Sequence, residues 1–200
     1  LTDEVNAAGD YVASKGGGRI FFPPGVYNIG GNIRVNQRTW WQGSGSSPYP
    51  SIFNQAFRPG ATVLWSYFNS TNAIFKGDLT QGDQVCLTLR PNVLGNVHSV
   101  WLRSKISDMV LDGEMSQASE GIFLDRVAAV EIKDVSFYGI PGHPIRVYAG
   151  NNIKISNCDS GNMGKGLDLR GCADLMVQEC FFDSPRGPAL RWYCNLSKAI

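Results

Sequence analysis

Ionisable and aromatic residues recur at intervals of 22 or 23 positions in the second half of this 200-residue sequence. One set consists of Glu120, His143 and Lys165. The other set consists of Asp125, Arg146, Tyr148, Asp168, Arg170 and Trp192. Carboxyl groups can donate or accept the proton in glycosidic cleavage, guanidinium groups bind carboxylates in pairs of hydrogen bonds, and flat aromatic faces can stack on sugar rings. These residue types predict a site for an acidic or neutral polysaccharide.

Three carboxyl groups are candidates for catalysis: Asp168, Glu120 and Asp125. In a hydrolase two carboxyl groups flank the scissile bond, about 5–5.5 Å apart for retention and roughly 6.5–9.5 Å apart for inversion. Asp125 and Asp168 belong to repeats two apart, which gives roughly 10 Å from strand spacing alone, and Glu120 with Asp168 gives no shorter estimate. A lyase would instead need one base. Four residues could serve as that base: Arg146, Arg170, Lys165 and His143.

Six residues are candidates for binding the substrate: Arg146, Tyr148, Arg170, Trp192, His143 and Lys165. A structural interpretation stays open for two of the named residues. Asp168 is expected directly over Arg146, where the two could form an ordinary cross-strand ion pair on an exposed sheet. His143 precedes Pro144 in a Gly-Pro region and is more typical of a turn residue than of a catalyst. A second outward ladder is typical of an ordinary solvated face: Glu131, Lys133, Lys154, Ser156, Met176 and Gln178.

Short strands repeated along the chain must position these residues. Four runs begin at Ile122, Ile145, Leu167 and Ala189, at spacings of 23, 22 and 22 residues. A second series begins at Ile106, Ile132, Ile155 and Val177, at spacings of 26, 23 and 22 residues. A fixed period in this range indicates a solenoid, and the alternating runs between Gly, Asn and Pro are too short for helical repeats. The sequence therefore predicts an all-β protein, a parallel β-helix with one coil per repeat.

Alternation along each strand predicts which side chains face the core. The expected inward positions are Ile122, Leu124, Ile145, Val147, Leu167, Leu169 and Ala189. Cys158 and Cys180 are 22 residues apart, as are Cys172 and Cys194. We expect both pairs to be reduced thiols stacked in the core, because free cysteine behaves as a small hydrophobic residue, although a strained bridge stays possible.

The chain is expected to form one domain over residues 1–200. Residues 1–15 predict a capping helix with Leu1, Val5, Ala8 and Val12 on one face, which would cover the open end of the solenoid. Residues 19–105 predict early coils interrupted by two irregular stretches, Ser44 to Gly60 and Ser66 to Gln84. Residues 106–200 predict regular coils, and the last of them begins a further coil, which indicates a fragment of a longer solenoid.

Composition excludes some classes of partner. The hydrophobic content of 43% is that of a globular protein. The net charge of +1, with charges interspersed, gives no electrostatic basis for binding nucleic acid or a membrane surface. No apolar run approaches the roughly 20 residues of a membrane span.

The first third of the sequence resembles a known superfamily. It contains the string Gly16-Gly17-Gly18-Arg19-Ile20-Phe21-Phe22-Pro23-Pro24-Gly25-Val26-Tyr27. Two shorter segments follow it, Trp41-Gln42-Gly43-Ser44-Gly45 and Thr62-Val63-Leu64. This resembles the N-terminal part of pectate-lyase-like proteins, of the variant common in bacteriophage tailspikes and related polysaccharide-degrading enzymes. The resemblance implies a right-handed parallel β-helix over essentially the whole chain. It is specific for the fold and not for the chemistry, because the string is a turn and cap device.

The catalytic motifs of two branches of that superfamily are missing from this sequence. Polygalacturonase-type hydrolases use paired aspartates and Gly-His-Gly, whereas this chain has Gly142-His143-Pro144 and no Asp-Asp. Pectate lyases use a calcium-binding aspartate cluster, and the sequence contains no tight cluster of that kind. We therefore expect no metal ligand and no cofactor; calcium stays possible, but no clear aspartate cluster supports it.

The leading hypothesis is a phage tailspike β-helix, in the virion tail or otherwise extracellular, that binds a bacterial surface polysaccharide and could also cleave it. Resemblance to tailspikes implies a homotrimer. One alternative is a non-catalytic structural or receptor-binding module of a virion or adhesin. The other is a secreted pectin-type lyase or glycoside hydrolase.

Overall fold

The structure is a computed structural model that describes residues 1–46, 60–66, 73–78, 85–88, 97–113, 120–161, 163–182, 187–188, 190–193 and 198–199. The two irregular stretches predicted in the early coils lie largely outside these residues, as do Ala189 and Cys194. Helix α1 spans Thr2–Ser14. No helix among the described residues has the length and apolar character needed to cross a membrane.

The strands are β1 (Gly18–Phe21), β2 (Gly25–Ile29), β3 (Ile33–Arg34), β4 (Thr39–Gln42), β5 (Thr62–Ser66), β6 (Ala73–Gly77), β7 (Val85–Thr88), β8 (Val97–Asp112), β9 (Glu120–Asp125), β10 (Val127–Tyr138), β11 (His143–Tyr148), β12 (Asn151–Ser156), β13 (Asp159–Gly161), β14 (Leu167–Arg170), β15 (Ala173–Gln178), β16 (Phe181–Phe182), β17 (Leu190–Tyr193) and β18 (Lys198–Ala199).

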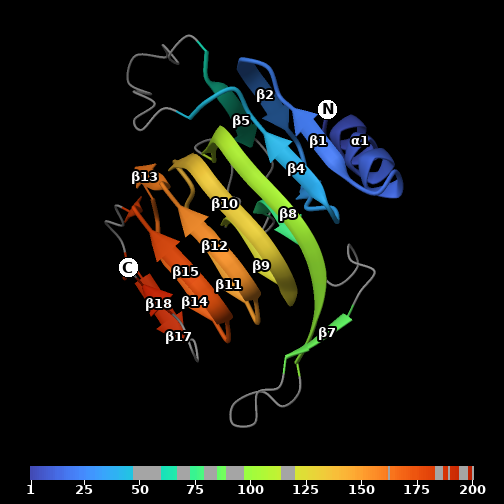
Figure 1. Ribbon diagram of the computed structural model, residues 1–200. Helices are drawn as coiled ribbons and strands as arrows, with labels where there is room; N and C mark the ends of the chain where they lie inside the picture. The colour runs from blue at the N-terminus through green and yellow to red at the C-terminus, as the bar shows by residue number, and fades with distance from the viewer. Residues whose placement is uncertain are drawn as a thin grey trace.

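Successive coils stack their strands in parallel, as the repeat predicts (Figure 1). We call the larger sheet, which contains β4, β8, β10, β12 and β15, sheet A, and the smaller one, in the order β17-β14-β11-β9-β6-β3, sheet B. Ile122 lies opposite Ile145 in sheet B, and Ile132 lies opposite both Ile106 and Ile155 in sheet A. The described part of the chain is therefore a parallel β-helix with one coil per repeat.

Residues with positive φ turn the chain at three corners of each regular coil. Left-handed backbone conformation breaks the extended strand and redirects it. The corner positions align from coil to coil in three columns: Arg126, Ala149 and Gly171; Arg103, Ala129, Asn152 and Asp174; and Asp108, Asp134, Asn157 and Glu179. At the third corner Asn157 Nδ2 donates to Asp134 Oδ1 of the preceding coil, which ties the two turns together. The corners fix which strand residues face the core and which face outward.

The core runs through the stacked coils as the alternation predicts. The inward side chains of β9, β11 and β14 are all buried: Ile122, Leu124, Ile145, Val147, Leu167 and Leu169. Cys158 and Cys180 occupy neighbouring coils at one register position, with Phe181 N donating to Cys158 O at 2.9 Å. Both are free thiols, and Cys158 is buried. The predicted alignment of this pair is therefore confirmed, although Cys180 is only partly buried, and the reduced state stays a prediction.

Helix α1 covers the end of the solenoid formed by the first coil, as predicted, but it uses a different face (Figure 1). Val5, Asn6 and Gly9 are buried, whereas Leu1 and Ala8 are exposed. The reason is that the contact face of the helix is set by hydrogen bonds to the segment of the edge strand β3 rather than by contact with an apolar surface. Asn6 Nδ2 donates to Asn32 O at 2.8 Å, and Asn6 Oδ1 accepts from Arg34 N at 2.8 Å. These bonds satisfy backbone groups that an open edge would leave unpaired.

Candidate functional site

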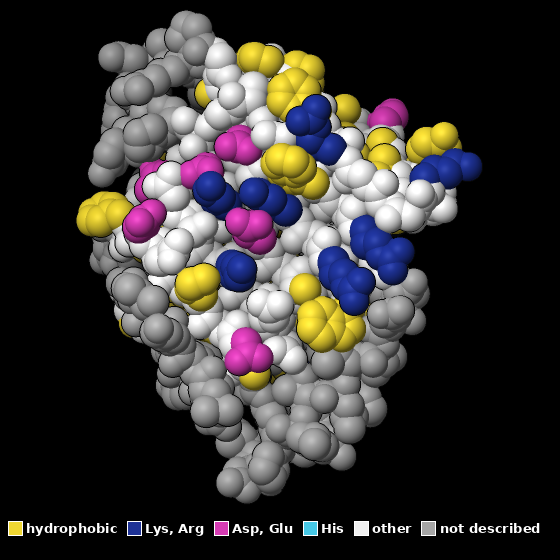
Figure 2. Space-filling model, viewed as in Figure 1, with side chains coloured by type: hydrophobic (Ala, Val, Ile, Leu, Met, Phe, Trp, Pro, Cys, Tyr) yellow, Lys and Arg dark blue, Asp and Glu magenta, His cyan; other side chains and the backbone are white. Residues whose placement is uncertain are grey.

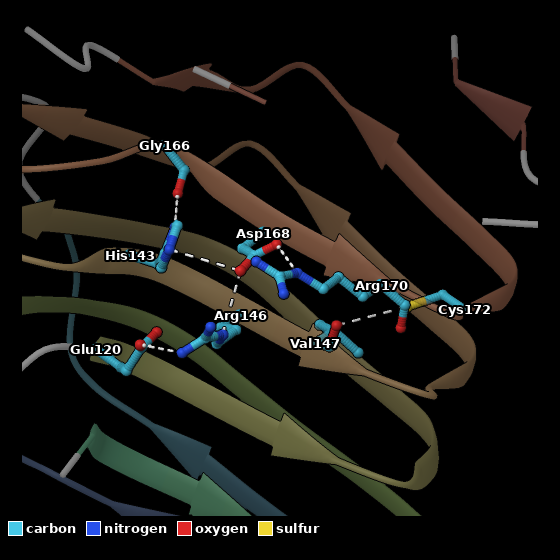
Figure 3. Close-up of polar contacts among 8 residues, drawn as sticks. All are labelled: Glu120, His143, Arg146, Val147, Gly166, Asp168, Arg170 and Cys172. Atoms are coloured by element: carbon cyan, nitrogen blue, oxygen red, sulfur yellow. Dashed lines mark hydrogen bonds and ion pairs between the residues drawn. The ribbon is translucent and has the colours of Figure 1, made fainter. Parts of the chain in front are cut away.

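The predicted charged residues meet on the outward side of sheet B, on strands β9, β11 and β14 (Figure 3). The register places Arg146 between Phe123 and Asp168. One step further along the strands, it places Tyr148 between Asp125 and Arg170. Glu120 lies opposite His143 at the start of the strands. We call the cluster of Glu120, His143, Arg146, Asp168 and Arg170 the sheet-B cluster.

Arg146 joins the two carboxyl groups of this cluster. Its Nη1 atom lies 2.9 Å from Glu120 Oε1, and its Nε atom lies 3.2 Å from Asp168 Oδ2. The ion pair expected between Arg146 and Asp168 is therefore present. Because both acceptors contact one rigid guanidinium group, the two carboxylate oxygens are no more than about 8.5 Å apart. This is shorter than the sequence estimate, since Arg146 on the middle strand draws both acids toward itself.

Asp168 is the centre of the cluster and is completely buried. Its Oδ1 atom accepts a hydrogen bond from Arg170 Nε at 2.7 Å, and its Oδ2 atom also lies 3.6 Å from His143 Nε2. A buried carboxylate is stable only when cations compensate its charge, and here two guanidinium groups do so. The side chains of Arg146 and Arg170 are 35% and 40% exposed. The expectation that Asp168 is solvent-facing is wrong, because these neighbours cover it.

His143 is the first residue of β11 and is buried, so the interpretation of it as a turn residue is wrong. Its Nδ1 atom lies 2.7 Å from Gly166 O. A carbonyl oxygen can only accept, so Nδ1 carries a proton and Nε2 faces Asp168. Burial lowers the pKa of His143, while the bond to Gly166 and the charge of Asp168 oppose that effect. The ring is therefore held by its bond to Gly166, and Nε2 makes an ion pair with Asp168 only when the ring is protonated.

Glu120 reaches the cluster because the start of β9 departs from regular alternation. A side chain at the next residue, Gly121, would place its Cβ 2.6 Å from Pro144 O and 2.8 Å from core atoms of Ile140 and Phe137. The core side of β9 is thus closed at Gly121. Glu120 itself is turned toward Arg146.

The carboxyl group of Glu120 is prepared to hold a proton near neutral pH. Burial raises its pKa from 4.5 to about 7, and this effect outweighs the charge of Arg146, which lowers the pKa. The charge of Asp168 raises this pKa further, and the exposed Lys165 lowers it. While Oε1 accepts from Arg146, Oε2 is buried and has no hydrogen-bond partner among the described residues. Glu120 therefore combines a near-neutral pKa with a buried oxygen atom that has no hydrogen-bond partner among the described residues.

Of three other predicted site residues, Asp125 and Lys165 lie apart from the cluster, whereas Tyr148 lies next to its member Arg170 in register. Asp125 is five residues along β9 from Glu120, which separates them by about 16 Å. Its carboxylate pairs with Arg126, Oδ2 to Nη2, at 3.1 Å. Tyr148 is 38% exposed at the end of β11, beside Asp125 in register. Lys165 is exposed just before β14, and its charge acts on the cluster without a direct bond to it among the described residues.

The position predicted for Trp192 is wrong by one residue. Leu190 rather than Ala189 pairs with Leu167, so this coil advances by 23 residues and not 22. Trp192 consequently lies opposite Leu169, a buried core position, and Arg191 takes the place opposite Asp168. The register therefore removes Trp192 from the predicted outward column.

Sequence reasoning missed Arg126, Gly121 and Gly166. Gly166 follows His143 by 23 residues, the interval that also separates His143 from Glu120, so the spacing could have identified it. Gly121 carried no comparable signal, because its role depends on the approach of Pro144 from the next coil.

The cluster does not resemble a metal site. Among the described residues, no group of three or more His, Cys, Asp or Glu side chains could hold a metal ion. Both acids of the cluster instead bind guanidinium groups. The residues therefore do not fit the calcium-binding aspartate cluster of pectate lyases.

The sequence matches no protein-family model and no curated protein. Solved structures match its fold. A glycosyl hydrolase candidate from Parabacteroides merdae is 15% identical, with a TM-score of 0.68 over 100% of this chain and 89% of that chain. The A-module of a mannuronan C-5 epimerase from Azotobacter vinelandii is 15% identical, with a TM-score of 0.63 over 90% of this chain and 46% of that chain. A tailspike protein of Acinetobacter baumannii bacteriophage Fri1, a capsular polysaccharide depolymerase, is 16% identical, with a TM-score of 0.61 over 100% of this chain and 37% of that chain.

This chain has the pectate-lyase-like right-handed parallel β-helix fold. At identities of 15–16% the likeness concerns the fold alone. The chain spans most of the Parabacteroides merdae protein but less than half of the epimerase module and of the tailspike. Its chemistry has to be argued from its own residues.

Proposed function

We propose that this chain binds an acidic polysaccharide across the sheet-B cluster and cleaves it there. The observation that supports this most strongly is that one buried carboxylate, Asp168, holds two half-exposed guanidinium groups, those of Arg146 and Arg170, on one face. Guanidinium groups held in place in this way lose little side-chain freedom when they bind a sugar carboxylate. With Lys165 nearby, the face carries more positive than negative charge, which favours a uronate-containing or otherwise acidic glycan.

Cleavage would use Glu120 as the proton donor. A carboxyl group with a pKa of about 7 is substantially protonated at neutral pH, so it can protonate the glycosidic oxygen as the bond to the anomeric carbon breaks. A water molecule would form the new bond to that carbon and release its proton to solvent. The Oε2 atom of Glu120 has no hydrogen-bond partner among the described residues, but it is buried, so the side chains that cover it would have to move before it could donate to a substrate. The upper limit of about 8.5 Å between the Glu120 and Asp168 oxygen atoms is compatible with both carboxylate separations that two-carboxylate hydrolases use, about 5–5.5 Å and roughly 6.5–9.5 Å. The present contacts of Asp168, however, make it the residue that positions Arg146 and Arg170.

A second candidate function is binding without cleavage. The burial of both carboxyl groups of the cluster favours it, because Asp168 is completely buried and Glu120 is only 5% exposed. In this case Glu120 would only orient Arg146.

The finer proposal is that the chain is part of a phage tailspike, placed in the virion tail or extracellularly and assembled as a homotrimer. It is supported by the fold shared with the Acinetobacter phage tailspike, a capsular polysaccharide depolymerase, of which this chain spans 37%. The glycan would then be a bacterial surface polysaccharide. Sedimentation equilibrium tests the trimer, which the proposal predicts and a monomer would contradict.

The proposal is tested by incubating the chain with a panel of acidic capsular polysaccharides and measuring new reducing ends and unsaturated uronate. Reducing ends without unsaturation indicate hydrolysis, and both together indicate a lyase. Glu120→Gln should abolish product while retaining binding, whereas Glu179→Gln, an exposed acid at a distant corner, should change neither. Binding without product would support the second candidate, and the absence of binding to any acidic glycan would overturn both.

A further inference from the structure

A depression of about 260 Å³ lies on the outward side of sheet A, away from the sheet-B cluster. It crosses three coils at the corner where β8, β10 and β12 bend. Its lining consists of Arg103, Ser104, Lys105, Ala129, Val130, Glu131, Asn152 and Lys154. Figure 2 shows this side of the molecule, where Lys and Arg side chains lie among hydrophobic ones. We call this depression the sheet-A groove.

The sheet-A groove has unbalanced positive charge. Arg103 and Lys154 are exposed, and neither has a carboxylate partner among the described residues. Lys105 Nζ lies 3.7 Å from Glu131 Oε2, so these two charges offset each other. Lys133, which lies outside the groove on the same sheet, is by contrast paired with Asp134 at 3.7 Å. Three cations therefore face one carboxylate in a concave surface.

Aromatic rings lie beside these cations. The Arg103 guanidinium lies 5.9 Å from the ring centre of Trp101, and Lys105 Nζ lies 5.0 Å from that of Trp40. Trp40 is held in place by a hydrogen bond of 2.8 Å from its Nε1 atom to Ser107 Oγ. Both indoles are half-buried, so each presents part of a flat apolar face next to a charge.

Ala129 keeps the sheet-A groove open. It occupies the left-handed corner position between Arg103 on the preceding coil and Asn152 on the following one. Its neighbours in this column have long or polar side chains, whereas its own methyl group leaves the centre of the corner unfilled. The depression therefore results from a small residue in a column of larger ones.

We infer that the sheet-A groove is a second binding site, for an acidic unit of an oligosaccharide. Arg103 and Lys154 would bind the anionic group of the sugar, and the indole faces would contact its ring. Glu131 would accept hydrogen bonds from sugar hydroxyl groups. The same carboxylate would repel the continuous phosphates of a nucleic acid, which favours a glycan ligand over a nucleic acid. The inference rests on the proposed glycan class but not on the sheet-B cluster.

The test uses hexagalacturonate as the probe, with maltohexaose as its neutral counterpart and oligothymidylate as a nucleic acid. Titration calorimetry at low salt is combined with NMR of the indole N–H groups. In the sheet-B variant Arg146→Gln/Arg170→Gln, hexagalacturonate should still bind and shift the Trp40 and Trp101 signals. Adding Arg103→Gln/Lys154→Gln should weaken this remaining binding at least about tenfold, because each loses a charge-assisted contact.

Two further variants control for indirect effects. Lys133→Gln removes one positive charge from the same sheet outside the groove and should change affinity less than about twofold. Ala129→Gln fills the groove without removing charge and should weaken binding as the charge variant does. A long side chain is compatible with this conformation, since Glu179 adopts it at another corner.

The outcomes separate this inference from the proposed function. If Arg103→Gln/Lys154→Gln leaves binding unchanged while Arg146→Gln/Arg170→Gln abolishes it, the second site is refuted and the sheet-B proposal stands. If the opposite pattern is found, the groove binds the glycan and the sheet-B proposal fails. Equal binding of maltohexaose, or tighter binding of oligothymidylate, would also overturn the inference.

Discussion

Glu120 is expected to make the stability of the fold depend on pH, and Glu120→Gln should remove that dependence. In the native state burial raises the pKa of this carboxyl group from 4.5 to about 7. Between these two pH values the folded protein keeps a proton that the unfolded chain releases. The free energy of unfolding therefore falls as the pH rises through this window.

The size of the effect follows from the two pKa values. A difference between 4.5 and about 7 corresponds to about 3 kcal/mol of unfolding free energy, lost between about pH 4.5 and pH 7. His143 acts in the opposite direction, because its lowered pKa makes the fold more stable as the pH rises through the ordinary value of 6.5. His143 is present in both proteins, so the difference between wild type and Glu120→Gln isolates the carboxyl group.

Urea denaturation followed by tryptophan fluorescence, at several pH values from about 4 to about 8, measures this difference. The unfolding free energy of Glu120→Gln minus that of the wild type should rise by about 3 kcal/mol across this range. Glu179→Gln should show no such change. A difference that stays constant within about 0.5 kcal/mol would show that Glu120 is already ionised in the folded protein, and would refute its role as a proton donor at neutral pH.

Three other predictions concern single residues. Asp168→Asn should destabilise the fold by about 1.5–3 kcal/mol, because two partly exposed guanidinium groups lose their shared counter-charge. A loss below about 0.5 kcal/mol in urea denaturation would contradict the assigned pairing. Gly164→Ala should lower the melting temperature strongly, because the added Cβ would lie 1.7 Å from Pro141 O. The control Gly31→Ala should have little effect, because its Cβ would lie 3.5 Å from the nearest atom. Equal melting temperatures of the two variants would contradict this packing. Cys180 should react with a maleimide before Cys158, and mass spectrometry can map the order. A hydrogen bond from Cys158 lowers the pKa of Cys180 to about 7, whereas the same bond and burial raise the pKa of Cys158. The reverse order would be inconsistent with the stack.

The period of the sequence was sufficient to predict the register of the regular coils. Arg146 lies over Asp168 and Ile145 lies over Ile122, as expected, because parallel strands of successive coils repeat at a constant distance. Alternation also identified the core side of β11 and β14. These features depend only on local pattern and strand geometry, which a single sequence contains.

The environment of each site residue could not be predicted in the same way. Asp168 occupies an outward position and is nevertheless buried, because the long side chains of Arg146 and Arg170 fold over it. Glu120 lies outward only because Gly121 closes the core side against Pro144. Both effects arise from contacts between coils, which alternation along one strand does not describe.

The local sequence pattern was also insufficient for β17 and helix α1, near the two ends of the chain. The position of Trp192 depends on how many residues the chain uses between β14 and β17, and one additional residue places it opposite Leu169 instead of Arg170. Helix α1 was recognised from its apolar spacing, but its contact face is set by the hydrogen bonds of Asn6 to the edge strand.

The position of a bound glycan tests the central claim most directly. A crystal structure of Glu120→Gln with an acidic oligosaccharide should show a sugar carboxylate within hydrogen-bond distance of the Arg146 and Arg170 guanidinium groups. It should also place a glycosidic oxygen next to the side chain at position 120. An oligosaccharide bound elsewhere, with both guanidinium groups free of it, would contradict the assignment of the sheet-B cluster as the polysaccharide site.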